Sequence, residues 1–393
     1  MGIKGIVHRL MLPNKGTDLY RFMRESKVNI MKKIAVLLLC FTTCILTFSC
    51  NNKQKVMNKN EETFEWSGSI STPYMYPIKL LPSALIFDKD DENGYKYMMS
   101  VNFTRTQWGS PGNVDGGSKS PLPYKLSITW LSWAEAKVYS GEFDLPKQKI
   151  AKLLREGYID FRNKRANYSD IVIGFAPEGA VFVWVWGNMS CVEVARFQAV
   201  EKEGYTVKDI SEYAKQKTLD EYCNAIVNNH SGVANYIAEH KLNNHIWDTY
   251  RERFKMRPVV EYLADGKGIT DHINIRYLNG EFECLNYEYL QTNSYPYIDR
   301  ARMEYVEVFH SSGSDMYMTE LHFDEKEIFD TYSKIYGNNP QQEVEFVIRI
   351  EPSNHIFQLL LRNNSEEVFL RETKINAYKL TDKSRRNFRV FNP

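Results

Sequence analysis

Short stretches in which apolar and polar residues alternate dominate the chain from about residue 65 onwards. Alternation with a period of two places one set of side chains on each face of an extended strand. Residues 180–186 show it most clearly, because their valines would take one face and Phe182, Trp184 and Trp186 the other. The same pattern predicts further strands in the first half of the chain, over residues 95–104, 125–130, 137–143, 170–175 and 191–199.

Helical spacing of apolar residues interrupts each of the two runs of predicted strands once. Residues 146–156 begin with Pro146, which is well tolerated in the first turn of a helix. Residues 324–335 carry an apolar stripe at helical spacing behind Asp324, a good N-terminal cap. Each stretch therefore predicts a single helix among the strands.

The order of these elements is repeated along the chain. Tyr139 aligns with Tyr317 at an offset of 178 residues, and Pro82 aligns with Pro258 at an offset of 176 residues. The apolar pattern between these points agrees as well, and we interpret the agreement as an internal duplication. The sequence thus predicts an α+β fold of two tandem units, each an antiparallel sheet plus one helix.

The segments around the two units complete the predicted division of the chain. Helical spacing between the units, broken by Gly232 and Asn-rich turns, predicts a helical connector. A segment rich in Asn, Lys and Glu ahead of the first unit predicts a tether. The boundaries are 50–64 for the tether, 65–205 for the first unit, 206–256 for the connector, 257–381 for the second unit and 382–393 for a C-terminal tail.

The start of the chain has the pattern of a secretion signal, over residues 31–49. Lys32 and Lys33 precede a mostly apolar stretch that is shorter than the roughly 20 residues of a membrane-spanning helix. Ser49 and Cys50 follow it and resemble the cleavage site of a bacterial lipoprotein. We therefore expect Cys50 to become the lipidated N-terminus of the mature protein.

This signal departs from the usual lipoprotein pattern at two positions. Thr47 and Phe48 stand where Leu and a small residue are usual, so an ordinary cleaved signal and a membrane anchor remain alternatives. Residues 1–30 show no matching pattern, whereas Met31 is followed by two lysines. We expect Met31 to be the natural start and residues 1–30 to be an over-called start.

The charge of the mature chain is slightly acidic. Residues 1–49 carry eight of the 50 basic and two of the 49 acidic residues, which leaves 42 basic and 47 acidic residues and a net charge near −5. Nucleic-acid binding needs clustered Lys and Arg, so we expect no nucleic-acid partner. The many tyrosines and tryptophans suit both β-sheets and recognition surfaces.

The pattern of cysteines gives no indication of a metal or redox site. Besides Cys50, the mature chain has Cys191, Cys223 and Cys284, which lie far apart and form no CxxC motif. One disulfide is possible in an oxidising compartment, and the sequence leaves the disulfide state open.

No sequence motif indicates catalysis, and we expect no catalytic residue, no bound metal and no cofactor. Residues 88–94 place carboxylates at positions one, three and five of a calcium-type loop. They lack the glycine at position six, and Met99 stands where the loop needs Glu. We interpret this segment as an acidic hairpin turn.

One set of polar and aromatic residues is a candidate recognition surface. Trp133, Glu135, Lys137 and Tyr139 alternate along a predicted strand and would share one face. Only the tyrosine has a counterpart in the second unit. The other interpretation is an ordinary exposed strand with a Glu–Lys pair, and such pairs are common.

Two aromatic-rich runs resemble a known family. Residues 130–139 with Leu145 and Pro146, and residues 247–254 with Arg257 and Pro258, are similar to the domain-of-unknown-function family 2931. The resemblance covers roughly residues 73–380. It implies a protein of Gram-negative bacteria, often a lipoprotein, with no established activity.

These observations give three hypotheses for function. The first is a non-enzymatic, lipid-anchored envelope protein that binds another protein and could be of the immunity type. The alternatives are a module that binds a glycan or small ligand through aromatics such as Trp108 or Trp133, and a carboxylate-based hydrolase. Because Asn51 follows Cys50 and no acidic cluster comes before Glu61, we expect the periplasmic face of the outer membrane.

Overall fold

The structure is a computed structural model that describes residues 61–86, 96–104, 106–112, 117–239, 246–263, 268–292, 295–312, 315–351 and 357–381. The predicted signal, Cys50 and most of the tether lie outside the described residues. So do the acidic turn at 88–94 and the C-terminal tail. The predictions about these segments stay predictions.

Two sheets enclose the core of the N-terminal sandwich, which we define as strands β1–β12. One sheet has the order β4 (Ser118–Pro121), β1 (Thr63–Ser71), β9 (Asp170–Ala176), β10 (Ala180–Gly187), β11 (Ser190–Gln198). The other has the order β12 (Val200–Glu201), β6 (Lys137–Asp144), β5 (Lys125–Ser132), β2 (Ile78–Ile86), β3 (Lys96–Thr104). Buried residues of both sheets and of helix α2 (Lys147–Glu156) form one apolar cluster. A small hairpin, β7 (Tyr158–Ile159) and β8 (Arg165–Ala166), follows α2.

The C-terminal sandwich, strands β13–β22, is built in the same way. Its first sheet has the order β16 (Ile298–Arg300), β13 (Phe254–Tyr262), β19 (Val344–Ile350), β20 (Phe357–Arg362), β21 (Glu367–Leu370). Its second has the order β22 (Lys374–Lys379), β18 (Asp315–His322), β17 (Met303–Ser312), β14 (Gly268–Tyr277), β15 (Phe282–Asn286). Helix α8 (Glu325–Tyr336) packs into this core, and α7 (Tyr287–Thr292) follows β15.

The strand pairing of the two sandwiches follows one scheme. β1 pairs in parallel with β9, and β13 pairs in parallel with β19. The hairpin β5–β6 precedes α2, just as the hairpin β17–β18 precedes α8. A late strand then adds to each hairpin, β12 to β6 and β22 to β18.

The predicted α+β class, with two units of one antiparallel sheet plus one helix, is wrong. The described residues are mostly strand, and each core lies between two sheets rather than on one sheet. Helix α2 packs into the first core, and α8 and Leu290 of α7 pack into the second. Strands β9 and β10 are buried on both faces, so alternation does not show which layer they belong to. The alignment of Pro82 with Pro258 was also wrong, because Pro82 lies in β2 and Pro258 in β13, the counterpart of β1.

The connector is helical, as predicted, and its described residues, 206–239 and 246–256, contain four short helices. They are α3 (Val207–Ile210), α4 (Leu219–Asn228), α5 (Ser231–Glu239) and α6 (Ile246–Thr249). Thr218 and Glu221 form a capping box that starts α4. Cys223, Val227 and Val233 pack on Leu131 and Val138 of the N-terminal sandwich. The connector thus has its own apolar contact with the sheet β12-β6-β5-β2-β3.

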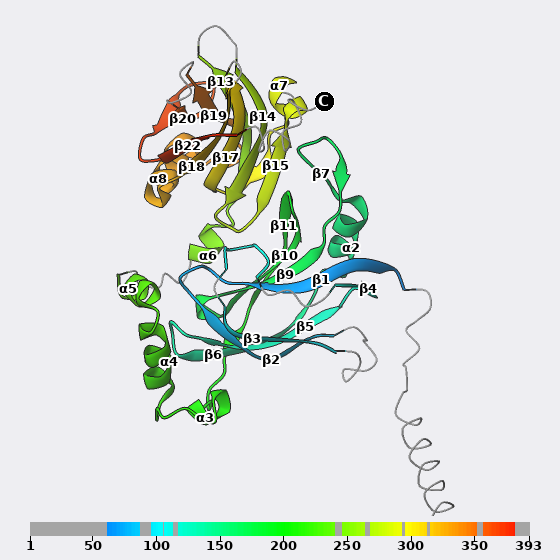
Figure 1. The fold of residues 1–393 in the computed structure, drawn as a ribbon, viewed down its shortest axis with the longest axis vertical. Coiled ribbons are helices and arrows are strands. Elements are labelled where there is room, and N and C mark those ends of the chain that lie inside the picture. The colour runs from blue at the N-terminus through cyan, green and yellow to red at the C-terminus, as the bar shows by residue number, and fades with distance from the viewer. Residues whose placement is uncertain are drawn as a thin grey trace, which may run out of the picture. The chain divides into compact units, whose positions relative to one another are not determined.

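The two sandwiches meet through direct backbone contact. β11 pairs with β15 at Ser190–Glu283 and Cys191–Phe282, which joins two of the four sheets into a ten-stranded sheet (Figure 1). Beside this pairing, a Cβ atom on Gly109 would lie 2.0 Å from the carbonyl oxygen of Gly280. The backbones at Gly109 and Gly280 can approach this closely only because both residues lack a side chain.

We predict that Gly109→Ala strongly destabilises the protein. Gly109 has φ +76 and no room for a methyl group, so the expected loss in free energy of unfolding is about 3 kcal/mol. Gly204→Ala is the matched control, since Gly204 has φ +85 but no atom within 4 Å of the added Cβ. That variant should lose only about 1 kcal/mol, from backbone strain alone. Urea unfolding of both variants measures the difference, and equal losses would contradict a tight Gly109–Gly280 contact.

Candidate functional site

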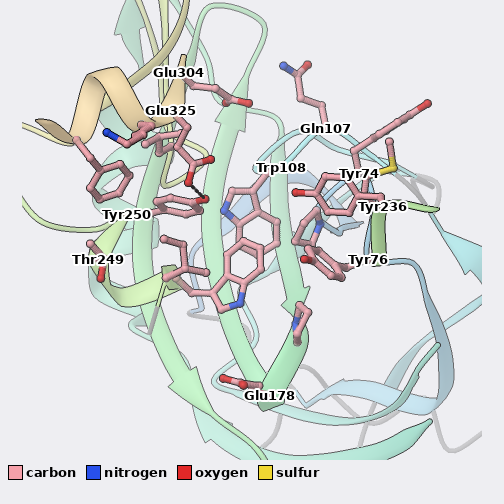
Figure 2. A pocket seen from close by; sticks show the side chains of 18 residues that line it. Tyr74, Tyr76, Gln107, Trp108, Glu178, Tyr236, Thr249, Tyr250, Glu304 and Glu325 are labelled. Atoms are coloured by element: carbon pink, nitrogen blue, oxygen red, sulfur yellow. Dashed lines mark hydrogen bonds between the residues drawn. The ribbon is translucent and has the colours of Figure 1, made fainter. Parts of the chain in front are cut away.

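A cleft with a cavity volume of about 840 Å³ opens beside the Gly109–Gly280 contact (Figure 2). Its lining comes from segments far apart in the chain. The N-terminal sandwich contributes the turn after β1, the segment before Gly109 and the turn between β9 and β10. The connector contributes α5 and α6, and the C-terminal sandwich contributes β17, α8 and Leu278. The cleft therefore exists only in the folded arrangement of all three parts.

Aromatic side chains form the wall of the cleft. The ring of Trp108 lies 5.5 Å from that of Trp247, and Trp247 lies 6.1 Å from Tyr76 and 5.7 Å from Tyr250. Behind Trp108, the buried ring of Trp184 is 4.8 Å away in an edge-to-face arrangement. Packed aromatic rings of this kind hold one another in place and lose little entropy when a ligand arrives.

Hydrogen bonds fix the segment that carries Trp108. The hydroxyl of Ser71 donates to the carbonyl oxygen of Gln107 at 3.1 Å, and the backbone N–H of Thr72 donates to the hydroxyl of Thr106 at 2.9 Å. The indole N–H of Trp184 donates to the carbonyl oxygen of Asn279 at 3.1 Å, next to Gly280. The wall is therefore tied both to the end of β1 and to the C-terminal sandwich.

Two carboxylates and a tyrosine occupy one end of the cleft. The hydroxyl of Tyr250 donates to Glu325 Oε1 at 2.9 Å. Glu304, on β17, is largely enclosed by protein, and its side chain has no hydrogen-bond or ion-pair partner among the described residues. Burial raises the pKa of Glu304, the positive charge of Arg276 opposes this, and the charge of Glu325 adds to it. This end of the cleft thus holds a largely enclosed carboxyl group that has no hydrogen bond or ion pair among the described residues, and the charge of Arg276 only partly offsets the effect of burial on its pKa.

A third carboxylate, Glu178, lies at the other end of the cleft (Figure 2). Glu178 sits in the turn η1 (Pro177–Gly179) with φ 64 and ψ 24, a backbone conformation that is uncommon for residues other than glycine. Its backbone N–H donates to both oxygens of Glu135, at 3.0 and 3.1 Å. The hydroxyl of Tyr139 donates to the same Glu135 at 2.8 Å. Glu135 and Tyr139 therefore hold the turn that presents Glu178.

The four residues of the predicted recognition surface do not form one exposed face. Trp133 and Tyr139 are buried, each with 5% of its surface exposed, and Trp133 packs 5.7 Å from the ring of Tyr222. Lys137 is exposed and pairs with Glu201 at 2.6 Å. The four side chains do not share one face of a strand because residues 133–136 form the turn between β5 and β6, where Ala136 has φ 52.

The residues that line the cleft carry no sequence pattern that distinguishes them from core or surface residues. Trp247, Tyr250 and Phe329 lie on helix faces or helix ends where aromatics usually serve the core. Glu304 lies on a strand and Glu178 in a turn, where acidic residues are expected at the surface. Trp108, a candidate ligand-binding aromatic in the sequence, does line the cleft, although it is only 8% exposed. Trp184, behind the wall, is fully buried.

The structure describes no metal site or disulfide in the residues it covers. In those ranges no group of three or more His, Cys, Asp or Glu side chains could hold a metal ion. Cys191, Cys223 and Cys284 are free thiols, and burial raises the pKa of each. No helix within the described part of the chain is both long and apolar enough to cross a bilayer.

Comparison with known proteins gives one match. Residues 51–240 match the family described as "Protein of unknown function (DUF2931)", which confirms the resemblance over that range. The second run that carried the resemblance, residues 247–258, lies beyond the matched range. No curated protein and no solved structure matches the chain.

We predict that Glu304→Gln stabilises the protein at neutral pH. A raised pKa means that the folded state holds the proton more tightly, so stability falls as pH rises above 4.5, the ordinary value for Glu, and stays lower. The amide removes this loss, and we expect the melting temperature at pH 7 to rise on the order of 2 °C, with little change below pH 4.5. Thermal unfolding at both pH values measures the effect. Glu203→Gln, at an exposed turn position, should change neither value, and a destabilised Glu304→Gln would contradict the assignment.

Proposed function

Starting from the match of residues 51–240 to a family of unknown function, we propose that the protein is a lipid-anchored, ligand-binding protein of the cell envelope. The observation that supports this most is the cleft of about 840 Å³, walled by packed aromatic rings and flanked by carboxylates. Ligand sites typically have volumes of roughly 300–1,000 Å³, an apolar wall and a few fixed polar groups. The cleft has each of these properties.

Binding explains the lining better than catalysis does. The residues that line the cleft include no Ser, Cys or His that could act as a nucleophile or as a nucleophile's base. The aromatic wall is held together by its own contacts, because Trp108 packs on Trp247 and Trp247 packs on Tyr250. A preformed wall of this kind reduces the entropy that a ligand must overcome.

The proposed location rests on the sequence of residues 31–50. A lipid at Cys50 would be followed by a short polar segment, since β1 begins at Thr63. Such a tether would let the sandwiches extend from the membrane into the periplasm. The periplasmic face of the outer membrane remains our preferred side, because Asn51 follows the lipidated cysteine.

Binding of a partner protein is the second candidate, and an immunity-type role is one version of it. The observation that favours it is strand β22, which lies at an edge of the ten-stranded sheet with all six residues exposed. Ile375 and Tyr378 on this strand are 37% and 46% exposed. An exposed edge strand can add a strand from another protein.

We predict that Cys50→Ala releases the protein from the membrane. Without the thiol no lipid can be attached, so incorporation of a labelled fatty acid should be lost and the protein should move to the released fraction. Cys223→Ala is the matched control. Because Cys223 is buried against the sheet, its replacement should leave fatty-acid labelling unchanged. Labelling that persists in Cys50→Ala would contradict lipidation at this residue.

We predict that a ligand copurifies with the protein and that Tyr74 is needed to retain it. Tyr74 lines the cleft and is 55% exposed, so Tyr74→Ala should weaken binding by about tenfold without unfolding the protein. Tyr213→Ala is the matched control, because Tyr213 is 91% exposed and lies outside the lining. Native mass spectrometry of protein from its own membrane should show an adduct in wild type and Tyr213→Ala, and little in Tyr74→Ala.

Two results would contradict the cleft as the binding site. One is an adduct that is equally strong in Tyr74→Ala. The other is the absence of any small adduct together with a stoichiometric partner protein that is lost when β22 is altered at Tyr378. The second result would replace the cleft by the partner-protein candidate.

A further inference from the structure

We infer that the cleft binds an extended cation with amino groups at both ends, of the diamine or polyamine class. The inference rests on the proposed function and adds the chemical class of its ligand. Three features of the cleft support it: the sign of its charge, the position of its carboxylates and the aromatic surface between them.

The lining is strongly biased towards negative charge. Glu178, Glu304 and Glu325 contribute carboxylates, whereas Lys326 is the one basic residue among the lining residues that the structure describes. Lys326 is 84% exposed and pairs with Asp330 at 2.5 Å, so its charge is already balanced outside the cleft. The excess of carboxylates in the lining disfavours an anionic ligand and favours a cation.

The two arginines behind the aromatic wall, Arg276 and Arg302, each contact other side chains of the protein. Arg276, which faces Glu304, donates to the hydroxyl of Ser110 at 3.0 Å and lies 4.9 Å from the ring of Phe282. Arg302 lies 4.4 Å from the ring of Phe329 and pairs with Glu252 at 2.7 Å. Neither side chain belongs to the lining. The carboxylate of Glu304 therefore lacks a hydrogen-bonded counter-ion in the described protein, although it is largely enclosed.

The carboxylates lie at the two ends of the cleft, and aromatic rings lie between them. Figure 2 shows Glu304 and Glu325 at one end, Glu178 at the other, and Trp108 in the middle. Tyr76, Trp108 and Trp247 line the cleft between these ends, and each tryptophan has 8% of its surface exposed. A cation near the face of such a ring gains about 0.5–2 kcal/mol, depending on how far it is desolvated.

This layout selects an extended ligand over a compact one. A single ammonium group can reach only one end of the cleft. A chain with an amino group at each end can pair with Glu304 and with Glu178 at once, and the second contact then forms within the complex. A neutral ligand of the same length would leave the largely enclosed carboxylate of Glu304 without a partner, which is unfavourable.

The test compares terminal octanediamine with terminal octanediol and octylamine, which match it in length but carry no charge and one charge. Isothermal titration calorimetry is carried out on the mature lipidated protein in neutral detergent at low salt. We expect the diamine to bind at least tenfold more tightly than octylamine and at least a hundredfold more tightly than the diol. The intrinsic fluorescence of Trp108 and Trp247 should change on binding of the diamine, because both rings line the cleft.

Variants locate the two ends of the ligand. Glu304→Gln and Glu178→Gln should each lower the affinity for the diamine at least tenfold. Each should also reduce the ratio of the affinity for the diamine to the affinity for octylamine. Glu203→Gln, at an exposed turn position, is the matched control and should leave the affinity unchanged. Glu304→Gln removes a largely enclosed charge that has no ion-pair partner among the described residues, so it should not unfold the protein. A loss of binding in this variant therefore reports on recognition of the ligand.

The inference is overturned if the diol binds as well as the diamine, if Glu304→Gln leaves the diamine affinity unchanged, or if no amine binds. These failures are distinct from a failure of the proposed function. If a neutral ligand copurifies with the protein and is lost in Tyr74→Ala, the cleft is still a binding site, and only the inference of a cationic ligand fails. If neither a probe nor a copurifying ligand depends on Tyr74, both proposals fail.

Discussion

The close contact of Gly109 with Gly280 is the constraint on which the rest of this structure depends. It brings the segment before Gly109 against the C-terminal sandwich, next to the point where β11 pairs with β15. Trp108 is thereby placed on Trp184, and Trp247 of the connector packs on Trp108. The aromatic wall of the cleft is thus a consequence of how the two sandwiches join. A side chain at Gly109 would separate the backbones and displace the wall with them.

The cleft also shows two features that lower stability, a strained backbone and an unpaired carboxyl group, and the proposed binding function would explain both. Glu178 keeps a left-handed backbone conformation, which costs on the order of 1–2 kcal/mol in a residue with a side chain. Glu135 offsets this by accepting the Glu178 N–H. Glu304 is a largely enclosed carboxyl group with a raised pKa. Strain and unpaired charge of this kind concentrate at functional sites, where a ligand provides the missing interaction.

Much of the local structure could be predicted from the sequence, whereas the layering and the site could not. Strands β5, β6, β9 and β10 and helices α2 and α8 lie within one or two residues of their predicted positions, because periodicity reports local geometry directly. β1 was missed because its segment, Thr63–Ser71, is rich in serine and glycine and follows a polar stretch. The number of sheets was also missed, since strands buried on both faces carry no signal for the layer they join. The sequence singled out Glu135 and Tyr139 as part of an exposed recognition surface. In the structure, Glu135 instead accepts hydrogen bonds from Tyr139 and from the backbone of Glu178. Trp133 packs against the helical connector.

The most direct test of this account is a crystal structure of the protein purified from its own membrane without exchange of bound molecules. The account predicts a well-defined elongated molecule in the cleft, with one end at Glu304 and Glu325, the other at Glu178, and its middle on the ring of Trp108. A cleft that holds only ordered water, while a molecule or partner chain occupies another surface, would contradict it.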